Sequence, residues 1–419
     1  MTGVKRWGDW IIPLFFALVP WDVSKVLFPP YQSGAETATT LDFLRLGMIL
    51  LVAWGAVRFI QLGIGKTFRR LVSTPLIWAV VPLFIAVLAS LTTALQPRTT
   101  MLEGLRLLLL FAVGVSMALG ADRKTVFDRV FKMIFVMATL TAVIGLTQYV
   151  SGRWIWGGGI NITSAGVLVR RVNATFIDPN IFARYLDISI LGTVLLLLRR
   201  QWPLRIWTAL ALLIQVAALG VTFSRTAWLI LLFGLLILFI TTTKHWKTRL
   251  NALGVGMLGV AALFLIPSIR ARFDTLFAGL SALGQREFLI KGGWSMFIEH
   301  PLTGVGLGNF QWAIEHPYHY LVPWSDAVTR SHTSVVTVAA EMGILGIIGM
   351  LAFLLLIAGM NLRVTNQINP YAQAVLIGIF VIWLSSQGEG RFFEDPMVWA
   401  FWGLSLAIQW KPWGEEWDG

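Results

Sequence analysis

The chain of 419 residues is 57% hydrophobic and only 13% charged, with a mean hydropathy of +0.74 and a net charge of +12. Soluble globular proteins carry about 25% charged residues, so this composition excludes an ordinary soluble protein. The basic residues lie mostly in short loops, so the net charge indicates orientation in a membrane rather than binding to nucleic acid. The absence of cysteine excludes disulfides and thiolate catalysis.

The apolar segments predict an all-α integral membrane protein. Their lengths of about 18 to 25 residues suit helices that cross a hydrocarbon core of about 30 Å, and tryptophans near their ends resemble an interfacial belt. The first segment lacks an Ala-x-Ala cleavage site, so we interpret it as an uncleaved span. We predict about twelve spans, at residues 10–28, 42–61, 74–95, 101–120, 126–150, 179–198, 204–221, 224–243, 250–267, 332–360, 371–388 and 396–410.

Lysines and arginines concentrate in alternate loops, which predicts that both termini are cytoplasmic. The same orientation places the polar loops 151–178 and 266–331 on the outer face. We therefore expect four segments: amino-terminal helices (1–165), central helices with arginine motifs (166–265), one large periplasmic loop (266–331) and carboxy-terminal helices (332–419).

Ionisable residues in the outer halves of the predicted spans indicate a polar cavity that opens outward, because charged groups at membrane depth are functional candidates. These residues are Asp42, Arg45, Glu103, Arg106, Arg184, Asp187 and Glu341. The outer loops also carry arginines against the orientation rule, which suggests that the arginines have another use. They are Arg170, Arg171, Arg225, Arg270, Arg272, Arg286 and Arg391.

His332 directly precedes a long hydrophobic segment and is a candidate general base, since neutral imidazole can accept a proton near physiological pH. The alternative is a structural histidine that hydrogen-bonds a loop carbonyl. Glu341 follows about two and a half helical turns later, where we expect a buried partner for an arginine. Glu341, Gly343, Gly346 and Gly349 repeat every two or three residues and predict a smooth face for close helix packing.

Three arginines suit an anionic ligand such as a diphosphate. Arg225 lies beside a helix start, where a guanidinium and the helix dipole favour the same anion. Arg171 precedes a similar loop-to-helix entry that ends at Asn180, and Arg286 lies in an amphipathic stretch that we expect along the membrane surface. The alternative for each arginine is a lipid-phosphate contact or a structural salt bridge.

Two other classes of site are poorly supported by the sequence. Residues 304–310 contain three glycines, but neither a preceding strand nor a following Lys-Ser/Thr is present, so a turn is favoured over a nucleotide loop. The carboxylates of the long loop are scattered, so a metal site for a diphosphate is not indicated. We therefore expect neither a metal nor another cofactor.

Several short motifs, in this order, resemble the O-antigen ligase and polymerase superfamily of bacterial membrane glycosyltransferases. The resemblance covers about residues 165 to 350. It implies a GT-C-like polytopic fold of about twelve transmembrane helices with one large periplasmic loop. The motifs are Arg171-Val-Asn-Ala-Thr-Phe-Ile-Asp-Pro-Asn180, Ser224-Arg-Thr-Ala-Trp228, Arg286 with Trp294, residues 300–310, and His332 with Glu341-Met-Gly-Ile-Leu-Gly346.

The resemblance implies a glycan transfer from undecaprenyl diphosphate to an acceptor, for which we expect lipid A-core oligosaccharide. The transfer would invert the configuration without a metal, at the periplasmic face of the bacterial inner membrane. The family's catalytic histidine maps onto His332 and its donor-binding arginines onto Arg225 and Arg286, with Arg171 less securely matched. Glu341 and Asn180 would support the site, and membrane lipids would surround it.

Two alternatives stay open at the level of the sequence. An O-antigen polymerase of the same superfamily would lengthen the carrier-bound glycan instead of moving it to lipid A-core. A transporter of lipid-linked saccharides belongs to a different class and predicts charges near the bilayer midplane and internal repeats. We find no convincing repeat between the two halves of the sequence, and the charges cluster on the outer side. These observations disfavour a transporter. The single large outer loop just before His332 resembles a ligase more than a polymerase, so we favour a ligase.

Overall fold

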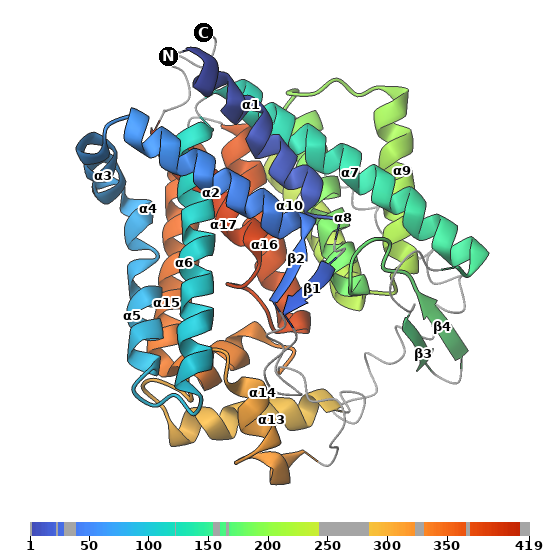
Figure 1. The fold of residues 1–419 in the computed structure, drawn as a ribbon. Coiled ribbons are helices and arrows are strands. Elements are labelled where there is room, and N and C mark those ends of the chain that lie inside the picture. The colour runs from blue at the N-terminus through green and yellow to red at the C-terminus, as the bar shows by residue number, and fades with distance from the viewer. Residues whose placement is uncertain are drawn as a thin grey trace. The chain divides into compact units, whose positions relative to one another are not determined.

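The computed structural model is helical, with two small antiparallel hairpins (Figure 1). It divides into two compact units. The first unit comprises Met1–Arg58 and Gly120–Thr275, and the second comprises Phe59–Leu119 and Leu276–Gly419. The residues that the structure describes are 2–21, 24–28, 39–121, 123–153, 160–164, 167–242, 285–322, 331–365 and 369–410.

In the first unit, the long helix α7 (Lys124–Ser151) packs against α1 (Thr2–Leu18), α8 (Pro179–Leu198) and α9 (Ile206–Val221). Helix α10 (Arg225–Thr242) packs against α8, and most of α2 (Phe43–Gln61) belongs to the same unit. Helix α8 begins where Asp178 caps it and Pro179 occupies its first position, two common start signals. Its residues are apolar nearly all round, which explains why most of them are buried.

The helical content agrees with the predicted all-α class, and two short hairpins, which the sequence did not predict, add to it. Strand β1 (Ser24–Phe28) pairs with β2 (Thr39–Asp42), and β3 (Ile160–Ser164) pairs with β4 (Val167–Arg171). The first helix ends at Leu18, so the predicted span 10–28 is too long. Pro20 disfavours helical backbone in the residue before it and supplies no N–H, which accounts for the stop.

The second unit is built around α15 (Ser334–Thr365), which packs against α5 (Val81–Ser90), α16 (Pro370–Glu389) and α17 (Pro396–Trp410). The described part of this unit also contains α3 (Ile64–Ser73), α4 (Pro75–Trp78), α6 (Pro97–Gly120) and α13 (Gln285–Glu299). Helix α13, the short α14 (Phe310–Glu315) and the 3-10 helix η2 (His319–Leu321) lie across one end of α5, α6 and α15 (Figure 1). Aromatic rings at Phe84, Phe111, Phe353, Trp399 and Trp402 hold the helices together.

Seven of the described helices are long and apolar enough to cross a membrane, namely α2, α6, α7, α8, α10, α15 and α16. An eighth span results if α3 and the stretch Pro75–Ser90, bent by 74°, count as one. Helix α9 and the apolar part of α1 are shorter than 18 residues, and the predicted span 250–267 lies outside the described residues. The chain is thus an integral membrane protein with many helices, while the number twelve stays a prediction.

Helix α15 is interrupted at Gly343, whose backbone (φ 61°, ψ −154°) is not helical. The loop after α13 inserts its backbone at this break. Ile344 N–H donates to the Pro301 carbonyl (2.8 Å), and Val305 N–H donates to the Ala340 carbonyl (2.9 Å). Backbone groups that the break would otherwise leave unpaired are satisfied by the loop. The predicted smooth glycine face is therefore wrong at Gly343, which makes a break instead of a packing contact along one continuous helix.

Candidate functional site

Arg171, at the end of β4, joins three segments of the first unit. Its side chain is buried. The guanidinium donates from Nε to the Thr222 carbonyl (2.9 Å) and from Nη2 to Asn180 Oδ1 (2.7 Å). The planar guanidinium holds its N–H donors in a fixed geometry, so one side chain fixes the positions of both partners at once. Arg171 therefore connects β4, the start of α8 and the turn before α10.

The turn before α10 carries Arg225. Thr222 Oγ1 donates to the Leu219 carbonyl (2.7 Å) and accepts from Ser224 N–H (3.2 Å), which closes the turn. Arg225 is the first residue of α10 and is partly exposed. The carbonyl that Arg171 binds belongs to Thr222, so Arg171 holds the turn from which α10 and Arg225 begin. The structure brings Arg171, Asn180 and this turn together, while their binding of a diphosphate stays a prediction.

Gln148 of α7 pins the loop between β4 and α8, and sequence reasoning did not single it out. Its Nε2 donates to the Ala174 carbonyl (2.8 Å), and its Oε1 accepts from Ala174 N–H (2.9 Å). The side chain is buried. An amide within an apolar span was the available signal, because a buried polar group in a helix needs partners from another segment.

In the second unit, His332 lies in a tight turn just before α15 and is partly exposed. The buried Ser331 organises this turn. Its Oγ donates to the Thr333 carbonyl (2.8 Å), accepts from Thr333 N–H (3.1 Å) and lies 2.9 Å from Thr337 Oγ1. The hydroxyl thus links both sides of His332 to the first turn of α15. The imidazole sits on a fixed piece of backbone.

Arg286 and the His332 turn both reach the last turn of α16. Arg286 Nη2 donates to the Gly388 carbonyl (3.4 Å). Ser334, the first residue of α15, lies 2.8 Å from Ser386 Oγ and accepts from Gln387 Nε2 at 2.7 Å. Helix α13, which carries Arg286, buries Leu289 but exposes the apolar Trp294 and Ile298, so the amphipathic helix at the membrane surface stays a prediction. The predicted site residues Arg286 and His332 are therefore joined through one helix end.

Glu341 is buried, and its Oε1 accepts from Phe310 N–H (3.2 Å) at the start of α14. A carboxylate at a helix N-terminus is electrostatically favourable. Because of this contact, Glu341 attaches the loop helix α14 to α15, while the predicted pairing of Glu341 with an arginine stays a prediction. The break at Gly343 comes two residues later, so Glu341 and the inserted loop stabilise each other.

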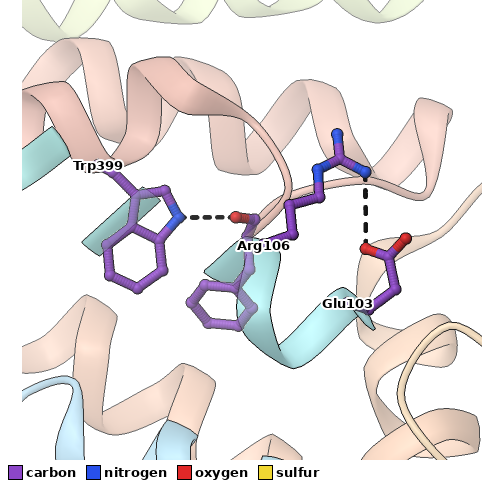
Figure 2. A network of polar contacts seen from close by, with 4 residues as sticks. Glu103, Arg106 and Trp399 are labelled. Atoms are coloured by element: carbon purple, nitrogen blue, oxygen red, sulfur yellow. Dashed lines mark hydrogen bonds and ion pairs between the residues drawn. The ribbon is translucent and has the colours of Figure 1, made fainter. Parts of the chain in front are cut away.

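Glu341 also lines a small cavity of about 20 Å³, together with Glu103, Ser334, Thr337 and Gly390. A volume of this size can hold about one water molecule. Glu103 pairs with Arg106 on α6 (3.5 Å), and nearby Trp399 Nε1 donates to the Phe393 carbonyl (2.7 Å) (Figure 2). Two of the ionisable residues predicted at an outward cavity, Glu103 and Glu341, therefore lie at the same cavity.

Three non-glycine residues with a positive φ angle lie within or directly beside the candidate motifs. Ala174 (φ 52°) follows Arg171, Phe223 (φ 51°) precedes Arg225, and the third is His332 itself (φ 59°). Among the described residues, Arg200 is the fourth such non-glycine residue. This region of backbone space is disfavoured for residues with a Cβ atom, and strained residues of this kind cluster at functional sites. The strain marks these motifs independently of their resemblance to a family.

The described part of the long loop is ordered by its own contacts. His316 stacks on Trp312 with ring centroids 4.2 Å apart, and Tyr318 Oη donates to Glu299 Oε2 (2.7 Å). Burial, and then this hydrogen bond, raises the pKa of the Tyr318 phenol, which keeps it a donor. Within the described residues, no group of three His, Asp or Glu side chains is placed to hold a metal ion. Metal-independence stays a prediction.

Comparison with known proteins gives one family. Residues 209–351 match the family model described as O-antigen ligase. The match includes Arg225, Arg286, His332 and Glu341, whereas Arg171 and Asn180 precede it. No curated protein matches the chain. The match supports an enzyme of the membrane glycosyltransferase type that acts as an O-antigen ligase or polymerase in lipopolysaccharide biosynthesis. The chain is therefore an integral membrane protein whose residues 209–351 match the O-antigen ligase family.

Proposed function

We propose that this protein is an O-antigen ligase that transfers a glycan from undecaprenyl diphosphate to lipid A-core oligosaccharide. The observation that carries the proposal is His332. It lies within the matched range, in a strained turn that Ser331 holds at the start of a long apolar helix. A titratable group so placed suits a reaction between a lipid-anchored donor and a lipid-anchored acceptor.

The reaction would take place at the periplasmic face of the bacterial inner membrane. The distribution of lysine and arginine supports this orientation, with both termini in the cytoplasm. The length of α15 supports a position of His332 outside the hydrocarbon core. A spanning helix needs about 20 residues, and the part from Ile344 to Thr365 meets that length alone. The part before the break, with His332 at its start, then extends beyond the hydrocarbon core into the polar region.

His332 would act as the general base. The neutral imidazole takes the proton of an acceptor hydroxyl, and the hydroxyl oxygen forms a bond to the anomeric carbon of the glycan. The bond from that carbon to the diphosphate oxygen breaks at the same time, and undecaprenyl diphosphate leaves with the electron pair. Attack opposite to the leaving group inverts the anomeric configuration. Atoms and charge balance without ATP or a metal.

The arginines would bind the diphosphate and neutralise the charge that develops on it. Arg225, at the N-terminus of α10, adds a guanidinium to a positive helix end, and Arg286 adds a second guanidinium. Arg171 would support donor binding by holding the Arg225 turn through Thr222, with Asn180 as its second partner. Glu341 would support the site by attaching the loop helix α14 to α15.

A reconstituted assay tests this proposal. Purified protein in detergent is mixed with undecaprenyl-diphosphate glycan and lipid A-core, and the products are separated by gel. A ladder shift of lipid A-core is the expected result. Growth of the carrier-bound glycan without such a shift would identify a polymerase. No transfer in detergent, combined with movement of donor across a sealed vesicle, would identify a transporter, because transport needs two compartments and transfer does not.

A further inference from the structure

The last turn of α16 lies against both His332's turn and Arg286, and no motif led us to it. Ser386 and Gln387 contact Ser334, two residues after His332, and Gly388 accepts from Arg286. All of these residues belong to the second unit. Ser334 and Ser386 are buried, at 1% and 0% exposure, so their hydroxyls need partners within the protein.

The hydrogen bonds of this cluster have one consistent direction. Ser386 Oγ donates to the Trp383 carbonyl (2.6 Å), which uses its single proton. Ser386 Oγ must then accept from Ser334, whose oxygen accepts in turn from Gln387 Nε2 (2.7 Å). The series of hydrogen bonds therefore runs from the Gln387 amide through the Ser334 and Ser386 hydroxyls to the Trp383 carbonyl. Each hydroxyl both donates and accepts, so the cluster fixes the relative position of α15 and α16.

The C-terminal end of α16, which carries Ser386 and Gln387, has a regular C-cap. Gly390 caps α16 in the left-handed conformation (φ 78°), and its N–H donates to the Ser386 carbonyl (2.8 Å). Such a glycine cap satisfies a carbonyl at the end of a helix. The Gly388 carbonyl that accepts from Arg286 thus belongs to a defined turn, and the same turn sets the position of Ser334.

From this geometry we infer that Ser334, Ser386 and Gln387 are positioning residues for glycan transfer. They hold the first turn of α15 so that the strained His332 presents its imidazole in one place, at a fixed relation to Arg286. None of the three side chains needs to touch substrate. The inference rests on the proposed function, since it assigns a use to the same histidine.

The test compares steady-state kinetics of transfer for wild type and Ser334→Ala. A shift of about 1 Å in a catalytic group can cost about a hundredfold in rate. We expect kcat to fall about 10-fold to 100-fold, with KM for donor and acceptor within about threefold of wild type. Ser334→Thr keeps the hydroxyl, and the small cavity that Ser334 lines gives space for a methyl group. It should restore most of kcat.

The matched control is Ser405→Ala. Ser405 is also fully buried in the second unit and accepts from Asn361 Nδ2 (3.1 Å), but it lies on α17. This variant should keep the wild-type kcat. Gln387→Met provides a second variant if Ser334→Ala fails to fold, because it removes the amide donor and keeps the side-chain length. The double variant Ser334→Ala/Ser386→Ala should have a kcat only slightly lower than that of Ser334→Ala. The effects of substitutions within one hydrogen-bond network do not add.

The outcomes separate this inference from the proposed function. If wild type transfers glycan and both Ser334→Ala and Gln387→Met keep its kcat, the positioning role is overturned and the proposed function stands. A rise in KM at unchanged kcat also overturns it, because it indicates contact with substrate. If the wild-type protein transfers no glycan, the proposed function fails, and the positioning role fails with it.

Discussion

His332 occupies a left-handed backbone conformation, which glycine adopts more readily than any residue with a Cβ atom. A residue with a Cβ atom in this region costs about 1 to 2 kcal/mol. Ser331 accepts from one neighbouring N–H and donates to the same residue's carbonyl, so the surrounding turn maintains the strain. A histidine kept at such a cost suggests a use for its imidazole rather than for its backbone.

This strain predicts an unusual order of stability among variants at position 332. His332→Gly should be more stable than His332→Ala by about 1 kcal/mol, because glycine adopts the left-handed conformation without a Cβ penalty. Both variants should be inactive. Thermal unfolding in detergent measures the difference. Equal stability, or a more stable alanine variant, would show that the turn does not hold a left-handed residue.

Arg171 leads to a second prediction at this scale. Arg171→Ala removes two hydrogen bonds of a buried charged group, which should cost about 2 to 3 kcal/mol of unfolding free energy. Its exposed neighbour provides the control, because Arg170→Ala should change stability by less than about 0.5 kcal/mol. Unfolding of both variants is compared with wild type. Unchanged stability of Arg171→Ala, together with a raised KM for the donor, would indicate direct donor binding instead of a brace.

Among the elements, α15 differs most from its expected form. Its break at Gly343 allows the loop after α13 to pair its backbone with the interior of a long helix. Hydrophobicity predicted a continuous span because the residues around Gly343 are apolar, and a break whose polar groups are paired leaves no trace in the hydrophobic pattern. The break separates a spanning part from the shorter part that follows His332.

Two glycines of α15 give a matched test of this break. A Cβ atom at Gly343 would lie 2.4 Å from carbonyl atoms of Leu302, and the backbone conformation there is nearly restricted to glycine. Gly343→Ala should destabilise the protein by about 3 kcal/mol or more. Gly359→Ala meets nothing within 4 Å and should be neutral or stabilising by up to about 1 kcal/mol. Similar yields and unfolding temperatures for both variants would contradict the break.

For the molecule as a whole, the helices with the longest apolar segments were predicted best from the sequence. Helices α7, α8 and α16 lie close to their predicted spans because long apolar runs with capping residues specify both type and boundary. The hairpins were missed because two-stranded pairs of four or five residues have no periodic signal of comparable strength. His332 and Arg286 could be proposed from sequence, but Gln387 could not, since its meaning depends on a partner 53 residues away.

The orientation of the whole chain can be tested directly because it has no cysteine of its own. Single cysteines are placed at two exposed positions, Tyr320→Cys in η2 and Lys66→Cys in α3. A thiol reagent that does not cross membranes should label Tyr320→Cys in intact spheroplasts, and Lys66→Cys only after permeabilisation. The reverse pattern would place the described part of the long loop in the cytoplasm.

The most direct test of the account replaces His332 with asparagine and measures glycan transfer. Asparagine tolerates the left-handed turn but cannot act as a base near neutral pH. His316→Ala is the control, because His316 stacks on Trp312 in the loop. A positioned base contributes about 100-fold to 10,000-fold, so a folded His332→Asn protein should transfer at less than about one hundredth of the wild-type rate. A rate within about threefold of wild type would contradict the central claim.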